Sequence, residues 1–143
     1  MSKYFDDLET RSADERAAAI AQALPRQIER AQALPGYAAT LSGVDPAAIR
    51  GVDDLATLPV LRKSDLGRAQ AAHAPLGGLT TRNASGFAHV FQSPGPIYEP
   101  GGDSHDWWRM GRFLKACGVG KGDIVQNCFG YHLTPAAMIF ENG

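Results

Sequence analysis

The residues most suited to chemistry form a short turn, Ser93–Pro96, with the sequence Ser-Pro-Gly-Pro. Proline fixes φ and glycine accepts positive φ, so the two prolines shape the turn in advance and Gly95 can take a conformation that other residues resist. A small polar turn of this kind is suited to holding a phosphate, and it is equally suited to reversing the chain. The residues themselves leave both interpretations open.

A second candidate is His132, because an imidazole can contact a carboxylate or act as a base. A single histidine without a visible partner is more often structural, so both roles stay open for it. The other histidines, His73, His89 and His105, have no metal-ligand spacing with it, and we predict no metal site.

Two further pairs of residues are assigned no chemistry. Cys117 and Cys128 lack CxxC spacing, which favours buried free thiols over a disulfide or metal role. Asp53 and Asp54 are adjacent at a predicted helix start, where carboxylates usually match the helix dipole at the surface.

The elements that would position the turn form a predicted β-hairpin over residues 87–100. Phe87–Phe91 alternates like a strand, and Ile97–Glu99 can return beside it, although Pro100 confines the second strand to an edge or a short length. Before the hairpin, residues 1–74 read as a helical arm. Ser12 and Glu15 form a capping box at its start, and Pro25 interrupts the apolar stripe of the helix that follows, so we expect a kink or a division there.

After the hairpin the pattern is helix, strand, helix. A helix from Ser104 to Cys117 leads through a glycine-rich turn to Ile124–Phe129, which reads as a largely buried strand. Tyr131, His132 and Leu133 leave the carboxyl end of that strand, the edge where open α/β sheets usually place ligands. We therefore expect one α/β domain over residues 1–143, with the helical arm at 1–74 and the α/β part at 75–143.

The last predicted helix begins at Pro135 and is barely two turns long at Gly143. A parallel sheet would need a further strand after it, so we expect the domain to be incomplete in this chain. Met138, Ile139 and Phe140 would then expose apolar surface, which favours a homodimer through this helix.

Composition excludes several classes of function. The chain has 143 residues and a formal net charge of −1, which gives no electrostatic reason to expect a nucleic-acid or anionic-membrane partner. The amino end carries no apolar signal core, and no run approaches the length of a membrane span. We expect a cytoplasmic protein.

Several stretches occur together in a recognisable order. Tyr4–Arg11 comes first, then Gly43–Pro46, Leu58–Leu66 with its Leu-Pro, Lys and Asp-Leu, and finally Cys117–Val125 followed by Gly130-Tyr131. Together they resemble the N-terminal part of the phenylacetate-CoA ligase family, within the AMP-forming acyl-CoA synthetase superfamily. The resemblance implies an α/β fold: a helical N-terminal arm, a β-hairpin and a helix–strand–helix unit, similar to the start of the large N-terminal domain of acyl-adenylate-forming enzymes.

The resemblance also implies a reaction and a site. A small carboxylic acid of the phenylacetate type attacks ATP with the help of Mg²⁺, and coenzyme A then displaces AMP. The family's phosphate loop falls on Ser93–Pro100, with Ser93 and Gly95 at matching positions, and Tyr131, His132 and Leu133 fall where the family lines its acyl pocket.

The phosphate loop departs from the family pattern. The family has Ser-Ser-Gly-Thr-Thr-Gly-Lys-Pro, whereas this chain has Ser-Pro-Gly-Pro-Ile-Tyr-Glu-Pro. Pro94 and Pro96 have no amide hydrogens to donate, and Glu99 places a negative charge where the pattern has a positive one. These changes argue against ordinary ATP binding. The family's later motifs, including its catalytic lysine, have no counterpart in this chain, so we predict no catalytic residue here and no tight cofactor binding by this chain alone.

Three hypotheses follow. In the first, the chain is the N-terminal segment of a divergent acid-CoA ligase and cannot complete catalysis alone. In the second, it is a non-catalytic module that kept the ligase scaffold and binds a small carboxylate, a ligase partner or a second copy of itself. In the third, it is a generic α/β domain and the resemblance is coincidental.

Overall fold

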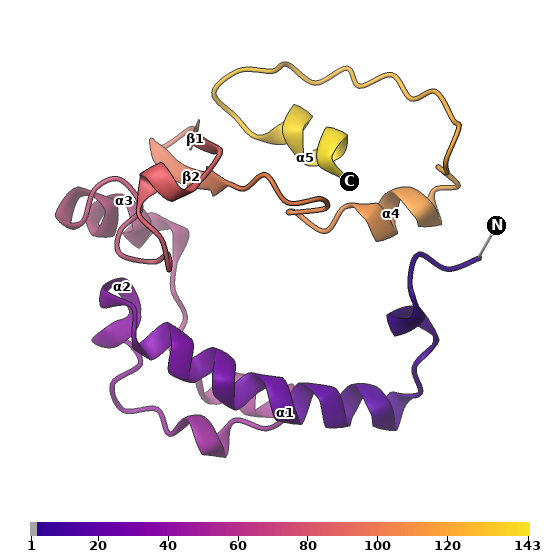
Figure 1. Ribbon diagram of the computed structural model, residues 1–143. Coiled ribbons are helices and arrows are strands. Elements are labelled where there is room, and N and C mark those ends of the chain that lie inside the picture. The colour runs from indigo at the N-terminus through magenta and orange to yellow at the C-terminus, as the bar shows by residue number, and fades with distance from the viewer. Residues whose placement is uncertain (1–2) are drawn as a thin grey trace. The chain divides into compact units, whose positions relative to one another are not determined.

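The computed structural model describes residues 3–143, and the chain divides into two compact units. One unit is Arg11–Asn83, and the other joins Met1–Thr10 to Ala84–Gly143. The first unit is helical and the second contains the hairpin, so the chain is a mixed α/β fold with a helical N-terminal part (Figure 1).

The helical unit begins with α1 (Ala13–Gln32), whose start is the capping box that the sequence predicted. The Ser12 hydroxyl accepts a hydrogen bond from the Glu15 amide at 3.2 Å, and the Glu15 carboxylate accepts one from the Ser12 amide at 2.7 Å. Pro25 lies inside α1 without dividing it. At the other end, the Gln32 side chain donates to the carbonyls of Leu41 and Val44, which holds the next turn against the helix.

The rest of this unit is a series of short pieces. They are α2 (Pro35–Ala38), two 3-10 helices at Pro46–Ala48 and Asp53–Thr57, and α3 (Lys63–Ala72). The Asp54 carboxylate accepts hydrogen bonds from the amides of Arg50 and Gly51, each at 2.8 Å, and these bonds lower its pKa. The small core consists of the buried residues Ile28, Leu41, Ile49 and Leu76.

In the second unit, β1 (His89–Ser93) and β2 (Ile97–Gly101) pair antiparallel, with Phe91 opposite Glu99 and Ser93 opposite Ile97. The predicted hairpin is confirmed, within two residues at its start and one at its end. Gly95, at the tip, has a φ of +148°, a positive value of the kind that the sequence analysis expected a glycine to allow here. The other regular elements are two 3-10 helices, Asp7–Thr10 and Ala84–Gly86, with α4 (Gly111–Ala116) and α5 (Ala136–Asn142).

The hairpin packs through its aromatic side chains. Phe91 is buried, stacks on His89 at a centroid distance of 5.6 Å and lies 6.0 Å from Trp108. Trp107 instead meets Phe87, edge to face, at 6.1 Å. The two neighbouring tryptophans therefore pack against different aromatic side chains.

The helix expected from Ser104 is shorter than the sequence indicated. Only Gly111–Ala116 is helical, because Asp106 and Arg109 adopt positive φ values of 51° and 60° that break the helical path. The expected Ser104 cap is not formed, because α4 begins only after Met110; the amide of its first residue, Gly111, donates to the Asp106 carboxylate at 2.9 Å.

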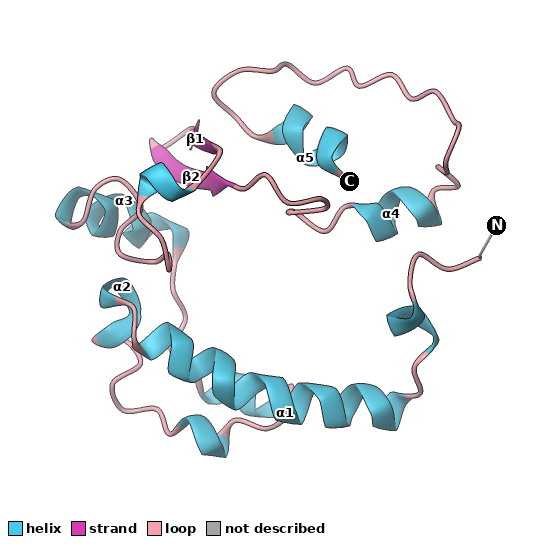
Figure 2. Cartoon of the chain, in the orientation of Figure 1, coloured by secondary structure: helices cyan, strands magenta, loops and turns pink. Residues whose placement is uncertain are grey.

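The predicted buried strand at Ile124–Phe129 is wrong. These residues run as a loop between α4 and α5 (Figure 2), and Ile124 is fully exposed. A strand exists only if another strand pairs with it, and within residues 3–143 the paired strands are β1 and β2. Ile124–Phe129 therefore has the composition of a strand, but within the described residues no strand pairs with it.

Two predictions about exposure also need correction. Met138, Ile139 and Phe140 are half-buried rather than exposed, because α5 packs on its neighbours: Phe140 stacks on Phe129 at 5.2 Å. Cys117 and Cys128 are free thiols, but both are exposed, since the helix end and the loop that carry them are not covered. In the described part of the chain, no helix combines the length and hydropathy needed to cross a membrane.

Candidate functional site

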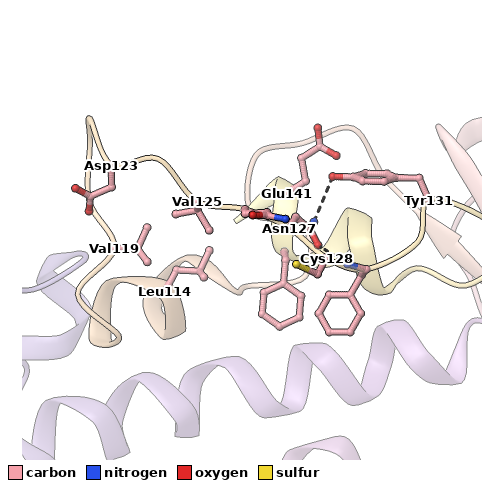
Figure 3. Close-up of a pocket in the computed structure, with 11 residues that line it drawn as sticks. Leu114, Val119, Asp123, Val125, Asn127, Cys128, Tyr131 and Glu141 are labelled. Atoms are coloured by element: carbon pink, nitrogen blue, oxygen red, sulfur yellow. Dashed lines mark hydrogen bonds between the residues drawn. The ribbon is translucent and has the colours of Figure 1, made fainter.

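A cavity of about 860 Å³ lies between α4, the loop after it and α5. Figure 3 shows its side chains, and we call it the aromatic cavity. Phe129 and Phe140 form one wall, while aliphatic side chains from α4 and the loop form another. The full lining is Leu114, Val119, Asp123, Val125, Gln126, Asn127, Cys128, Phe129, Tyr131, Phe140 and Glu141.

Asn127 holds the loop of this cavity against α5. Its side-chain amide donates to the carbonyl oxygen of Ala137 at 2.9 Å. It also donates to the hydroxyl of Tyr131 at 3.2 Å (Figure 3). Its carbonyl oxygen accepts a hydrogen bond from the Phe129 amide at 3.1 Å. The Asn127 side chain thus bonds to Ala137 in α5 and to two residues of the cavity wall, Phe129 and Tyr131.

Tyr131 and Glu141 make the polar edge of the cavity. A hydrogen bond to Glu141 raises the pKa of the Tyr131 phenol; partial burial and the charge of Glu141 raise it further, while the bond from Asn127 lowers it. The phenol therefore keeps its proton to a higher pH than an ordinary tyrosine does, and its oxygen accepts the hydrogen bond from the Asn127 amide at 3.2 Å.

A second hollow, of about 600 Å³, lies beside the hairpin tip, and we call it the turn groove. Gln92–Pro96 line one side and His132–Thr134 the other. The Gln92 amide donates to the Leu133 carbonyl at 2.8 Å, which ties the two segments together. Ser93 and Gly95 thus lie beside His132 and Leu133, whereas Tyr131 belongs to the aromatic cavity.

His132 is exposed and adopts a defined local geometry. Its Nδ1 lies 3.4 Å from the Thr134 amide nitrogen and 3.5 Å from the Thr134 hydroxyl, so Thr134 holds this side of the ring. The ring lies over Gly130, where a Cβ atom would come within 2.7 Å of it. Its described hydrogen-bond partner is Thr134 and not a carboxylate, which fits a structural or ligand-contacting role better than that of a paired base.

The turn groove does not fit a triphosphate. The Ser93 hydroxyl donates to the Ile97 carbonyl at 3.3 Å, which uses it to close the hairpin. Pro94 and Pro96 have no amide hydrogen, and no lysine or arginine occurs among the described residues that line the groove. Gly95 is left as the backbone donor between the two prolines, without a cation to complement phosphate charge.

Glu99 lies in the returning strand that the sequence predicted, and not at the tip of the turn, although the family resemblance aligns it with the phosphate loop. It is inside β2 opposite Phe91, half-buried, and does not line the groove. The poor fit for phosphate therefore comes from the missing donors and cations around the tip, not from a carboxylate in the loop.

Sequence reasoning missed Asn127 and Glu141. The available signal was Asn127 itself, because asparagine is depleted in strands and here interrupts an apolar run. Nothing comparable marks Glu141, since its role depends on where α5 places it relative to Tyr131.

No family model matches the sequence, and neither does any curated protein. Solved structures of 2-hydroxyisobutyryl-CoA ligase do match. In the postadenylation state with 2-HIB-AMP, the TM-score is 0.84 and the identity 27%, over 96% of this chain and 31% of the ligase. In the thioesterification state with 2-HIB-AMP and CoA, the TM-score is 0.81, with the same identity and coverage. An open conformation with both ligands gives a TM-score of 0.74 at 29% identity, over 85% of this chain and 28% of the ligase.

The chain thus spans about a third of the length of the ligase that it matches. Its helical start and hairpin correspond to the beginning of the ligase's N-terminal domain. The chain resembles the N-terminal portion of an AMP-forming acyl-CoA ligase.

Proposed function

We propose that this chain forms the acid-binding N-terminal part of an AMP-forming acyl-CoA ligase. The observation that carries the proposal is its match, over 96% of its length, to a ligase bound to an acyl-adenylate. In such a ligase a carboxylate attacks the α-phosphate of ATP, releasing pyrophosphate with Mg²⁺ assisting, and coenzyme A then displaces AMP.

The aromatic cavity is the proposed acyl pocket. Its volume, about 860 Å³, lies within the usual range for small-molecule sites, and its walls are mainly apolar. Glu141 is negatively charged and would repel the carboxylate of an acid, so the acyl tail is expected to face the Tyr131–Glu141 edge. The ring pair Phe129 and Phe140 supports an aryl acid of the phenylacetate type as the substrate, with Tyr131 as a contact.

His132 and Leu133 are proposed to contact the same substrate from the turn groove, where the carboxylate end would lie. The His132 Nε2–H is the donor suited to that carboxylate. Ser93 and Gly95 mark the phosphate-loop position, but the cationic groups for ATP phosphates and Mg²⁺ are proposed to come from other parts of a ligase. The same holds for coenzyme A.

Acid-dependent exchange of pyrophosphate into ATP, measured on the natural protein, tests this function. We expect exchange that requires an added acid, with phenylacetate and 2-hydroxyisobutyrate compared side by side to distinguish an aryl from a hydroxyalkyl pocket. Tyr131→Phe should lower kcat/KM by about threefold to tenfold, because one hydrogen bond is lost. Tyr98→Phe, outside the cavity, is the matched control.

A second candidate is a non-catalytic module that binds a small carboxylic acid. The turn groove favours it, because two prolines and an occupied Ser93 hydroxyl leave little to hold a triphosphate. Saturable acid binding without any exchange would support the module, whereas robust exchange would exclude it.

A further inference from the structure

Glu141 is the carboxylate at the polar edge of the aromatic cavity. Asp123, the other charged residue of the lining, is used by the turn before the loop, where it accepts a hydrogen bond from the Gly120 amide at 2.8 Å. No lysine, arginine or histidine occurs among the described residues that line the cavity. The salt bridges within residues 3–143 do not include Glu141 either. Its negative charge is therefore not neutralised by a basic side chain of the described chain.

The groups beside Glu141 leave room for a further hydrogen-bond donor. The Tyr131 phenol lies next to the carboxylate, and this contact is the largest cause of its raised pKa (Figure 3). The phenol oxygen is also held by the Asn127 amide at 3.2 Å. A carboxylate accepts several hydrogen bonds, so one phenol does not saturate it. Both Glu141 and Tyr131 are exposed, so a cation bound there keeps part of its hydration and its desolvation cost stays low.

The aromatic wall suits the same kind of ligand. Phe129 and Phe140 stack at a centroid distance of 5.2 Å with their planes 12° apart, so an aryl ring can pack against them. Ring faces also attract a cation that lies within about 6 Å of the centroid. Phe140 and Glu141 are consecutive in α5, so one helix holds both the wall and the carboxylate.

We propose that the aromatic cavity binds an aryl acid that carries an ammonium group at the end remote from its carboxylate, with Glu141 as the residue that binds this group. The inference rests on the proposed function and deepens it by naming the class of acid. An uncharged tail gains only the apolar wall, whereas an ammonium tail also gains a charge-assisted hydrogen bond to Glu141. The acid's own carboxylate then lies away from Glu141, which would repel it.

Two acids of equal size test the proposal on the chain itself. These are para-(aminomethyl)phenylacetate and para-ethylphenylacetate, which differ in the charge of the far end, and their binding is followed by NMR. We expect the amine to bind with a Kd about fivefold to twentyfold lower. Its largest shifts should fall on Phe129, Tyr131 and Phe140. The difference in Kd should shrink as salt is added, because the edge of the cavity is open to solvent.

Two variants separate the charge of Glu141 from the charge of the whole chain. Glu141→Gln removes the charge and keeps the size of the side chain, so the two acids should then bind with equal affinity. Glu29→Gln is the matched control, because it removes the same charge from an exposed position of α1 that does not line the cavity. It should keep the preference for the amine.

Several results would overturn the proposal: no saturable binding, equal affinity of the original chain for the two acids, or a preference that persists in Glu141→Gln. If para-hydroxyphenylacetate bound as tightly as the amine, the requirement for a positive charge would be wrong. Acid-dependent pyrophosphate exchange is a separate signal. Its absence beside a clear preference for the amine would contradict the ligase function and support the ammonium site, whereas exchange without that preference would do the reverse.

Discussion

Tyr131 is the residue of the aromatic cavity whose pKa is shifted by its neighbours. Its phenol lies between the Glu141 carboxylate and the Asn127 amide, and the bond to Glu141 is the largest cause of its raised pKa. Because the folded state holds the phenolic proton more firmly than the unfolded chain does, stability from this contact is present below the ordinary tyrosine pKa. It is lost as pH rises through the raised value.

Glu141→Gln should therefore lower the pKa of Tyr131 toward its ordinary value, since the negative charge is removed and the hydrogen-bond acceptor is weakened. The measurement is an NMR titration of the Tyr131 ring carbons. Asn127→Ala is the opposing control, because the bond from Asn127 lowers the pKa and its removal should raise it. An unchanged titration in both variants would contradict the proposed polar edge.

Gly95 allows a second test at this scale. Its φ of +148° is rarely adopted by other residues, and a Cβ there would lie 3.2 Å from the Ile97 side chain. Gly95→Ala should destabilise the fold by about 1–3 kcal/mol, measured by denaturant unfolding. Gly67→Ala, on an exposed position of α3 with open space around it, should instead stabilise by about 0.5–1 kcal/mol. If the two substitutions changed the free energy of unfolding equally, the turn would not require a glycine at position 95.

At the level of elements, α1 depends on its capping box. Ser12→Ala should cost about 1 kcal/mol, because the Glu15 amide loses its acceptor and the Glu15 carboxylate loses a donor. The bonds from the Ser12 amide and hydroxyl lower the pKa of Glu15, so the contribution of Glu15 is present above its ordinary pKa and is lost as pH falls through the lowered value.

Thermal unfolding of Glu15→Ala beside the original chain checks this pH dependence. The variant should melt lower at neutral pH, and the difference should vanish in acid. A difference that persists when Glu15 is protonated would show that something other than the capping box is responsible.

The elements that depend on local chemistry were predictable. The capping box needs only Ser12 and Glu15, and the hairpin tip needs only the Pro-Gly-Pro sequence, so both follow from residues close in the chain. Ile124–Phe129 was not predictable in the same way, because strand residues become a strand only through a partner elsewhere. The helix expected from Ser104 does not form through Asp106 and Arg109, because both adopt positive φ values that no local sequence pattern predicts.

At the level of the whole molecule, the candidate site was predictable only in part. The sequence singled out Ser93, Gly95, His132 and Leu133, and the structure brings all four to one groove. The contact between the hairpin tip and residues 132–134 is tertiary, so the sequence could not predict it. Tyr131 was singled out with His132 but lines a different cavity. Asn127 and Glu141 were missed because their roles arise from tertiary placement by α5.

We propose that this chain carries the acid-binding wall of a ligase. Heteronuclear NMR of the chain, titrated with phenylacetate and with 2-hydroxyisobutyrate to millimolar concentration, tests it most directly, because weak binding is visible residue by residue. We expect saturable shifts that centre on Phe129, Tyr131, Leu133 and Phe140, and that weaken in Tyr131→Ala. Shifts that do not saturate, or that fall in the helical unit around Val60 instead, would contradict it.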